Sequence, residues 1–321
     1  MSLPSAKSAY LGWLARALEP ERSPLAPISG PVVGDVVLGY GTGYDAADIA
    51  PFVLSLRAVF DGAVALVVDD RADLKAFLAE HGVIAVHPQH LDGWEPHAVM
   101  ARFAAFDRLL GQWPEAKSVL ITDVRDVIFQ AEPFSPVPER LETYVEFEDG
   151  VLRDHDFNMK YLRAVGGDDL AEAVADKPCV CVGTVMGPRY AMIRFCRTVM
   201  MLAAIPRSEL GGAFGADQAA CNLAIHMGLV EADIRPNYGR VATLGLTKPE
   251  SLGWSDGRVI NPDGGWSAIV HQHDRHPTLA TAVHARWGGG LEHRERVQKK
   301  TAAQRFEKQK RSIRRRLPEL R

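Results

Sequence analysis

Cysteine and long apolar runs are scarce in this sequence, and no internal repeat is evident. The longest apolar stretches, such as 63–68 and 193–205, fall short of the ~20 residues that a helix needs to span a bilayer. The first ten residues carry one lysine and no continuous apolar segment, so we expect no signal peptide and a cytoplasmic protein. The four cysteines contain no Cys-x-x-Cys pair, which argues against a disulfide framework or a paired-cysteine zinc site. These residues are Cys179, Cys181, Cys196 and Cys221.

The composition is that of a globular protein with a substantial core. Of the 321 residues, 47% are hydrophobic and 24% are charged. Charge is unevenly distributed, because residues 291–321 hold twelve Lys or Arg and four Glu, a net of +8, whereas the preceding residues carry −11. With a Gly-rich break at 288–290, this predicts an N-terminal helix and linker over 1–31, one domain over 32–290 and a basic tail over 291–321.

The tail carries apolar residues at helical spacing. Phe306, Ile313 and Leu317 suit one helical face among many basic residues, which predicts a basic amphipathic helix. Such a helix can lie on an anionic membrane, which would place the protein peripherally on the inner membrane face. A solvated run of charge is an equally good interpretation. Nucleic acid is not expected as a partner, because the acidic body offers no second basic face.

Short apolar runs alternate with helical patterns in the first half of the chain. Buried strands are predicted at 35–39, 63–68, 83–86 and 119–121, and helices at 51–60, 72–80 and 97–110. This alternation predicts an α/β fold of the Rossmann-like kind, with a mostly parallel central sheet flanked by helices. Ligands of such sheets bind beyond the carboxyl ends of the strands, where the sequence places polar residues. These are the segments 40–44, 69–71 and 123–126.

The strongest local signal is a buried strand that runs directly into two carboxylates. Residues 118–122 are followed by Asp123 and Asp126, with Arg125 between them. Carboxylates at a strand end suit Mg²⁺ or Mn²⁺, and such an ion would bridge the oxygens of a diphosphate. The alternative is a turn in which Arg125 only neutralises its neighbours.

A histidine-rich segment follows much later, at 269–277. His271 and His273 are two residues apart, so on a strand both would face the same site. An imidazole can join carboxylates around Mn²⁺. His276 is expected to be structural.

A Gly-rich loop at 211–216 leads into a predicted helix over 218–228. Asp217 is expected to be the N-cap of this helix, because Asp is among the best N-cap residues. An N-cap role does not exclude a further functional role for Asp217 or Gln218. Cys179 and Cys181 are expected to be small core residues.

Together these pieces resemble the GT-A-fold glycosyltransferases, the nucleotide-diphospho-sugar transferase superfamily. They look most like bacterial relatives of the glycogenin and lipopolysaccharide galactosyltransferase group. The resemblance spans about residues 36–277 and rests on four matches. These are the strand and turn over 39–44, Arg102 in a helix upstream of the acidic motif, the acidic segment 120–130, and Asp217-Gln218 with the late His271. The acidic motif is spaced Asp-x-x-Asp, whereas the family has Asp-x-Asp.

The resemblance implies a GT-A-type sheet and a metal-dependent sugar transfer, with retention of configuration as the expected outcome. The donor would be a nucleotide-diphosphate sugar, and the acceptor a cell-envelope polysaccharide, lipopolysaccharide or related glycan or lipid-linked acceptor. Mn²⁺ or Mg²⁺ would be held by Asp123, Asp126 and His271, while Asp217 and Gln218 would face the anomeric carbon or the acceptor. The implied donor contacts are Gly41, Thr42, Tyr44, Asp70, Arg102, Asp123 and Arg125.

A different class of function stays open beside this one. A protein of the same fold could have lost turnover and bind or scaffold at the membrane surface through its tail. The sequence keeps both acidic residues and His271, which favours activity.

Overall fold

The computed structural model describes residues 6–19, 22–26, 30–91, 93–204 and 214–291. All of them belong to one compact unit, which ends at Leu291. The predicted basic helix of the tail therefore lies outside the described residues. No helix in the described ranges is both long and apolar enough to cross a membrane.

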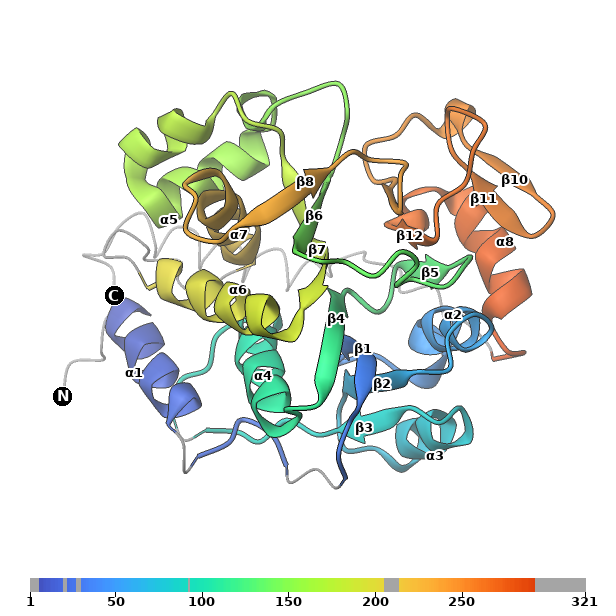
Figure 1. Ribbon diagram of the computed structural model, residues 1–321, viewed down its shortest axis with the longest axis horizontal. Coiled ribbons are helices and arrows are strands. Elements are labelled where there is room, and N and C mark those ends of the chain that lie inside the picture. Colours follow the sequence, from blue (N-terminus) through green and yellow to red (C-terminus); the bar gives the residue numbers. More distant parts are fainter. Residues whose placement is uncertain (1–5, 20–21, 27–29, 92, 205–213, 292–321) are drawn as a thin grey trace, which may run out of the picture. The chain divides into compact units, whose positions relative to one another are not determined.

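The fold is α/β and is built on a seven-stranded central sheet. The strand order is β3-β2-β1-β4-β7-β6-β8 (Figure 1). Strand β7 runs antiparallel to both of its neighbours, and the other adjacent pairs are parallel. The strands are β1 (Gly34–Tyr40), β2 (Ala63–Val67), β3 (Ile84–Val86), β4 (Ala116–Thr122), β6 (Leu141–Val145), β7 (Val180–Pro188) and β8 (Ala232–Arg235). The predicted mostly parallel sheet is confirmed.

Helices cover both faces of this sheet. Successive side chains along a strand point to opposite faces, and on each face they pack with helices into an apolar layer. Val36 and Leu38 of β1 belong to one layer, and Val37 belongs to the other. Helices α1 (Ala6–Leu18), α4 (Ala98–Gln112), α5 (Asp156–Val174), α6 (Arg189–Leu202) and α7 (Ala216–His226) contribute to the first layer. Helices α2 (Ala46–Arg57) and α3 (Ala72–Glu80) contribute to the second.

A small three-stranded sheet extends from the connection after β4. Its order is β5-β12-β9, with β12 antiparallel to β5 and parallel to β9. A hairpin of β10 and β11 and helix α8 complete this part of the chain, which lies on the right in Figure 1. The elements are β5 (Val127–Phe129), β9 (Val241–Thr243), β10 (Gly253–Ser255), β11 (Arg258–Ile260), β12 (Ile269–His271) and α8 (Pro277–Trp287), with short 3₁₀ turns at Leu152–Asp154, Pro249–Ser251 and His273–Arg275.

The helices predicted within the described residues are found, and two of their starts differ from expectation. Helix α2 begins at Ala46 because Asp45 and Asp48 form a capping box, and Pro51 is accommodated inside the helix. Helix α7 begins at Ala216, so the prediction of Asp217 as its N-cap is wrong. Gly215 is the N-cap, at φ 90°, where a side chain would be strained and would also meet Tyr161.

Candidate metal centre

The connection between β4 and β5 places two carboxylates at the carboxyl edge of the central sheet. Asp123 directly follows β4, and its backbone N–H donates to the Gly183 carbonyl at 2.8 Å. Asp126 directly precedes β5, whose first residue, Val127, pairs with His271 at the end of β12. The pairing of these short strands therefore brings a late histidine beside two early aspartates.

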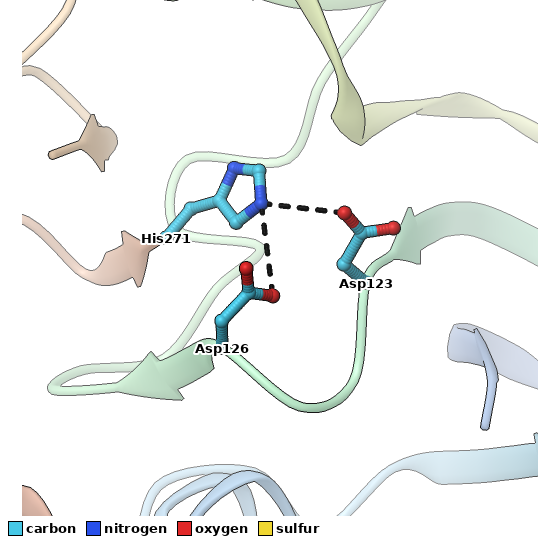
Figure 2. A group of neighbouring side chains, drawn as sticks. All are labelled: Asp123, Asp126 and His271. Atoms are coloured by element: carbon cyan, nitrogen blue, oxygen red, sulfur yellow. Dashed lines mark ion pairs between the residues drawn. The ribbon is translucent and has the colours of Figure 1, made fainter. Parts of the chain in front are cut away.

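The three side chains converge on one point (Figure 2). His271 Nε2 lies 3.4 Å from Asp123 Oδ2 and 3.9 Å from Asp126 Oδ1. One ligand atom from each residue falls within 4.8 Å of the others. An octahedral ion with ligands at about 2.1 Å separates those ligands by about 3.0 to 4.2 Å, and both distances from His271 Nε2 fall in the range that suits Mg²⁺ or Mn²⁺.

Two further observations fit a metal at this point. His271 Nε2 is buried and forms no well-aligned hydrogen bond among the described residues, so its partners there are the two carboxylates. Gly183 lies against the group, and a Cβ there would approach His271 Cε1 to 2.4 Å and Asp123 Oδ2 to 2.8 Å. Only glycine leaves the space that the ligands need.

Arg102 of α4 binds one oxygen of the Asp123 carboxylate and leaves the other for the candidate metal site. Its guanidinium contacts Asp123 Oδ1 at 2.5 Å and Asp217 Oδ2 at 2.8 Å, and Arg102 is 7% exposed. Asp123 Oδ2 is left toward His271. Burial opposes the ionisation of Asp123, but Arg102 and His271 outweigh it and hold its pKa well below the usual range. Burial, reinforced by Asp123, raises the pKa of Asp126.

The second ring nitrogen of His271 faces a thiol. Its Nδ1 lies 3.6 Å from Cys181 Sγ, at the start of β7. Metal-ligating histidines commonly engage their other ring nitrogen in this way, which fixes the ring. Burial disfavours the imidazolium, but the contacts with Cys181, Asp123 and Asp126 outweigh it and raise the pKa of His271 well above its ordinary value. The expectation that Cys181 is only a core residue misses this contact.

A cavity of about 610 Å³ opens over this cluster. The described residues that line it include most of the predicted site. They are Thr42, Tyr44, Arg102, Asp123, Arg125, Asp126, Asp217, Gln218 and His271. Arg125 lies between the two acidic residues in sequence, forms a 2.7 Å ion pair with Asp274 and lies over the Tyr44 ring, 6.0 Å from its centre. Arg125 therefore pairs directly with Asp274, and its charge also acts on Asp126 without a direct contact.

Two predicted donor contacts lie outside the cavity wall. The backbone N–H of Gly41 donates to the Val67 carbonyl, so this residue joins β1 to β2 beneath the site. Asp70 points away and pairs with Lys75 at 2.6 Å, with its side chain 65% exposed. Its neighbour Asp69 is the inward carboxylate, and it accepts from the Gly43 N–H at 2.7 Å beside an adjoining cavity of about 370 Å³.

Gln218 lines the cavity, and both ends of its side-chain amide form hydrogen bonds within the protein. Its Oε1 accepts from the Val182 N–H at 2.9 Å, and its Nε2 donates to the Val180 carbonyl at 3.0 Å and to Glu146 Oε2 at 3.1 Å. The side chain therefore holds the start of β7 and orients a third carboxylate. Asp217 likewise acts through Arg102.

The histidines after His271 do not share its site. Gln272 adopts φ 61° and ends the strand, so the period-two expectation for His273 fails. His273 is buried away from the cavity wall, and burial lowers its pKa to about 3. His276 Nε2–H donates to the Leu244 carbonyl at 2.7 Å, as expected of a structural residue.

Glu146 is the main site residue that the sequence analysis did not find. It is the first residue after β6, as Asp123 is the first after β4, and it lines the cavity. The signal was available, because Leu141–Val145 is a short apolar-rich segment that runs into a carboxylate.

Comparison with known proteins assigns no family to this chain. No protein-family model matches it, and a search of curated proteins finds no match.

Proposed function

We propose that this protein is a metal-dependent glycosyltransferase of the GT-A type. It would move a sugar from a nucleotide-diphosphate sugar to a cell-envelope polysaccharide, lipopolysaccharide or related acceptor, with retention of configuration. The observation that carries the proposal is the group formed by half-buried Asp123 with buried Asp126 and His271, which opens into a cavity of about 610 Å³ at the carboxyl edge of a mostly parallel sheet.

The charges around the cavity suit a diphosphate leaving group. A divalent ion on the three ligands would supply Lewis acidity toward that group. Arg102 holds Asp123 so that one carboxylate oxygen faces the ion site, and the guanidinium is itself fixed by Asp217. Preorganised charge of this kind needs no rearrangement as the leaving group develops negative charge, which is where most of the rate enhancement belongs.

The remaining cavity wall provides two ends for two substrates. Thr42 and Tyr44 follow β1 and line the cavity, and Thr42 also borders the adjoining cavity beside Asp69, so the nucleoside is assigned to that end. Asp217 and Gln218 lie in the first turn of α7 and also line the cavity, where Gln218 supports the start of β7 and Asp217 holds Arg102. The transferred sugar is assigned to the space between these two ends.

The test is a thermal-shift panel of nucleoside diphosphates and nucleotide-sugars, each with and without Mn²⁺. A ligand that binds only the folded state at 100 times its dissociation constant stabilises it by about 2.7 kcal/mol. We expect a shift with one nucleotide family that needs Mn²⁺. The shift should be lost in Asp126→Asn and His271→Ala and kept in Asp70→Asn, a matched control outside the cavity.

Hydrolysis or transfer of the identified donor would then be followed by release of the nucleoside diphosphate. Absence of a Mn²⁺-dependent shift with every nucleotide would overturn the transferase proposal. In that case the non-catalytic binding protein, acting at the membrane surface, becomes the better account.

A further inference from the structure

We infer that the cavity holds a carbohydrate-binding subsite, formed by an aromatic wall of Phe157 and Phe214 and by the carboxylate of Glu146. This inference rests on the proposed function and deepens it, because it assigns the acceptor as a sugar ring. An acceptor hydroxyl on a protein side chain or a lipid phosphate would need different chemistry in this subsite.

The aromatic wall and the ring that supports it come from three distant segments of the chain. Phe157 lies in the first turn of α5, Phe214 precedes α7, and His97, which packs against the wall, is the N-cap of α4. The Phe214 ring lies 5.7 Å from the His97 ring and 6.1 Å from the Phe157 ring, both edge-to-face. Each contact has the geometry that stabilises aromatic pairs, so the wall is held in shape without a ligand.

These aromatic side chains are exposed although they line a cavity. Phe214 is 56% exposed and Phe157 is 40% exposed, whereas phenylalanine is usually buried. Exposed apolar surface within a concave site marks a place where a ligand removes it from water. The ligand for this wall must therefore present an apolar face.

Glu146 supplies the polar counterpart. Its Oε2 accepts from Gln218 Nε2 at 3.1 Å and from the Cys179 thiol at 3.2 Å, which fixes the carboxylate. No described residue forms a hydrogen bond or ion pair with Oε1, and Glu146 lines the cavity. An oriented carboxylate oxygen with no cation partner is suited to accept hydrogen bonds from neutral hydroxyl groups.

A pyranose ring matches this pair of features. One face of the ring presents C–H groups that can stack on phenylalanine, and its edge presents hydroxyl donors for a carboxylate. A second phosphate does not fit, because Glu146 would repel it. A nucleobase could stack on the wall, and the experiment below separates that case.

The experiment measures sugar binding directly, without a known donor. Saturation-transfer NMR detects weak contacts of methyl hexosides and short hexose oligosaccharides with the full-length protein. We expect contacts from the C–H face of at least one hexoside. Binding should weaken about tenfold or more in Phe214→Ala and Glu146→Gln, and recover in Phe214→Tyr.

Matched controls lie outside the cavity wall. Tyr190→Ala removes an aromatic ring that is 71% exposed on α6, and Glu148→Gln removes an exposed carboxylate two residues from Glu146. Both variants should bind the hexoside as the wild type does. Retained thermal stability of Phe214→Ala and Glu146→Gln excludes loss of fold as the cause.

The outcomes separate this inference from the proposed function. Hexoside binding that depends on Phe214 and Glu146 supports the subsite, whether or not nucleotides bind. A Mn²⁺-dependent nucleotide shift without hexoside binding would overturn the subsite and leave the transferase proposal standing. Loss of nucleoside diphosphate binding in Phe214→Ala would also overturn it, because the aromatic wall would then belong to the nucleobase.

Discussion

At the scale of single residues, the candidate site depends on the contacts that the two ring nitrogens of His271 make. His271 contacts Asp123 and Asp126 through Nε2 and Cys181 through Nδ1. In the metal-free protein these contacts raise the pKa of His271 and so favour the protonated ring. A metal ion can bind only when that proton leaves.

Mn²⁺ binding is therefore expected to release a proton and to strengthen as pH rises. The raised pKa of His271 means that protonation competes with the ion below that pKa, so apparent affinity should rise by about tenfold per pH unit where one proton is displaced. Isothermal titration calorimetry in two buffers of different ionisation enthalpy measures the proton count. An affinity that does not change between pH 6 and 8 would contradict the assignment of His271 as a ligand.

Gly183 is expected to be essential for the site because of space. In Gly183→Ala, the new Cβ would crowd the His271 ring and Asp123, which should cost about 1–3 kcal/mol of stability and weaken Mn²⁺ binding at least tenfold. Gly111→Ala is the matched control, since nothing lies within 4 Å of its Cβ position and it lies in α4. Urea unfolding should show that control to be more stable, by about 0.5–1 kcal/mol. Equal Mn²⁺ affinity in both variants would count against the crowding argument.

At the scale of elements, one arginine joins the ends of two helices to a strand. Arg57, the last residue of α2, donates to the carbonyls of His81, Phe60, Gly62 and Gly82 at 2.7 to 3.2 Å. These acceptors belong to the turn before β2 and to the end of α3, so a single side chain satisfies both connections. Hydrogen bonds from a charged donor are worth more than neutral ones.

Arg57→Met is expected to lower the free energy of unfolding by about 3 kcal/mol, because four carbonyls lose a charged donor while the apolar stem is kept. Urea unfolding followed by circular dichroism measures the change. Arg163→Met is the control, since its nearest carboxylate oxygen is 3.9 Å away at the exposed surface of α5, and it should change little. Similar losses in both variants would refute the role of Arg57.

The sequence predicts helices and strands well where apolar periodicity is clear. It predicts helix ends and the placement of site residues less well, because tertiary contacts decide them. The apolar runs that became β1 to β4 and the helical spacing of α3 and α4 are local signals. Gly215 as the N-cap of α7 and Gln272 at positive φ are decided by tertiary packing, so Asp217 and His273 were misplaced. Glu146 follows a strand, which is a local signal, but its link to the site depends on Gln218, which lies 72 residues later in the chain.

At the scale of the whole molecule, the site lies entirely within the compact unit that ends at Leu291. Removal of residues 292–321 is therefore expected to leave Mn²⁺ and nucleotide shifts unchanged. That segment contains all twelve Lys and Arg of the basic tail, so its removal should abolish sedimentation with anionic phospholipid vesicles. Equal vesicle binding by the full and shortened chains would favour a solvated tail.

The three candidate ligands belong to two separate sheets, and this has a mechanical consequence. Asp123 extends from β4 of the central sheet, whereas Asp126 and His271 adjoin β5 and β12 of the small one. A bound ion would link the two sheets, because its coordination bonds would come from side chains on both of them. Amide hydrogen exchange at Ile128 and Val270, which pair within the small sheet, should therefore slow when Mn²⁺ is added. The ion would govern how often this corner of the molecule opens, at residues that never touch it.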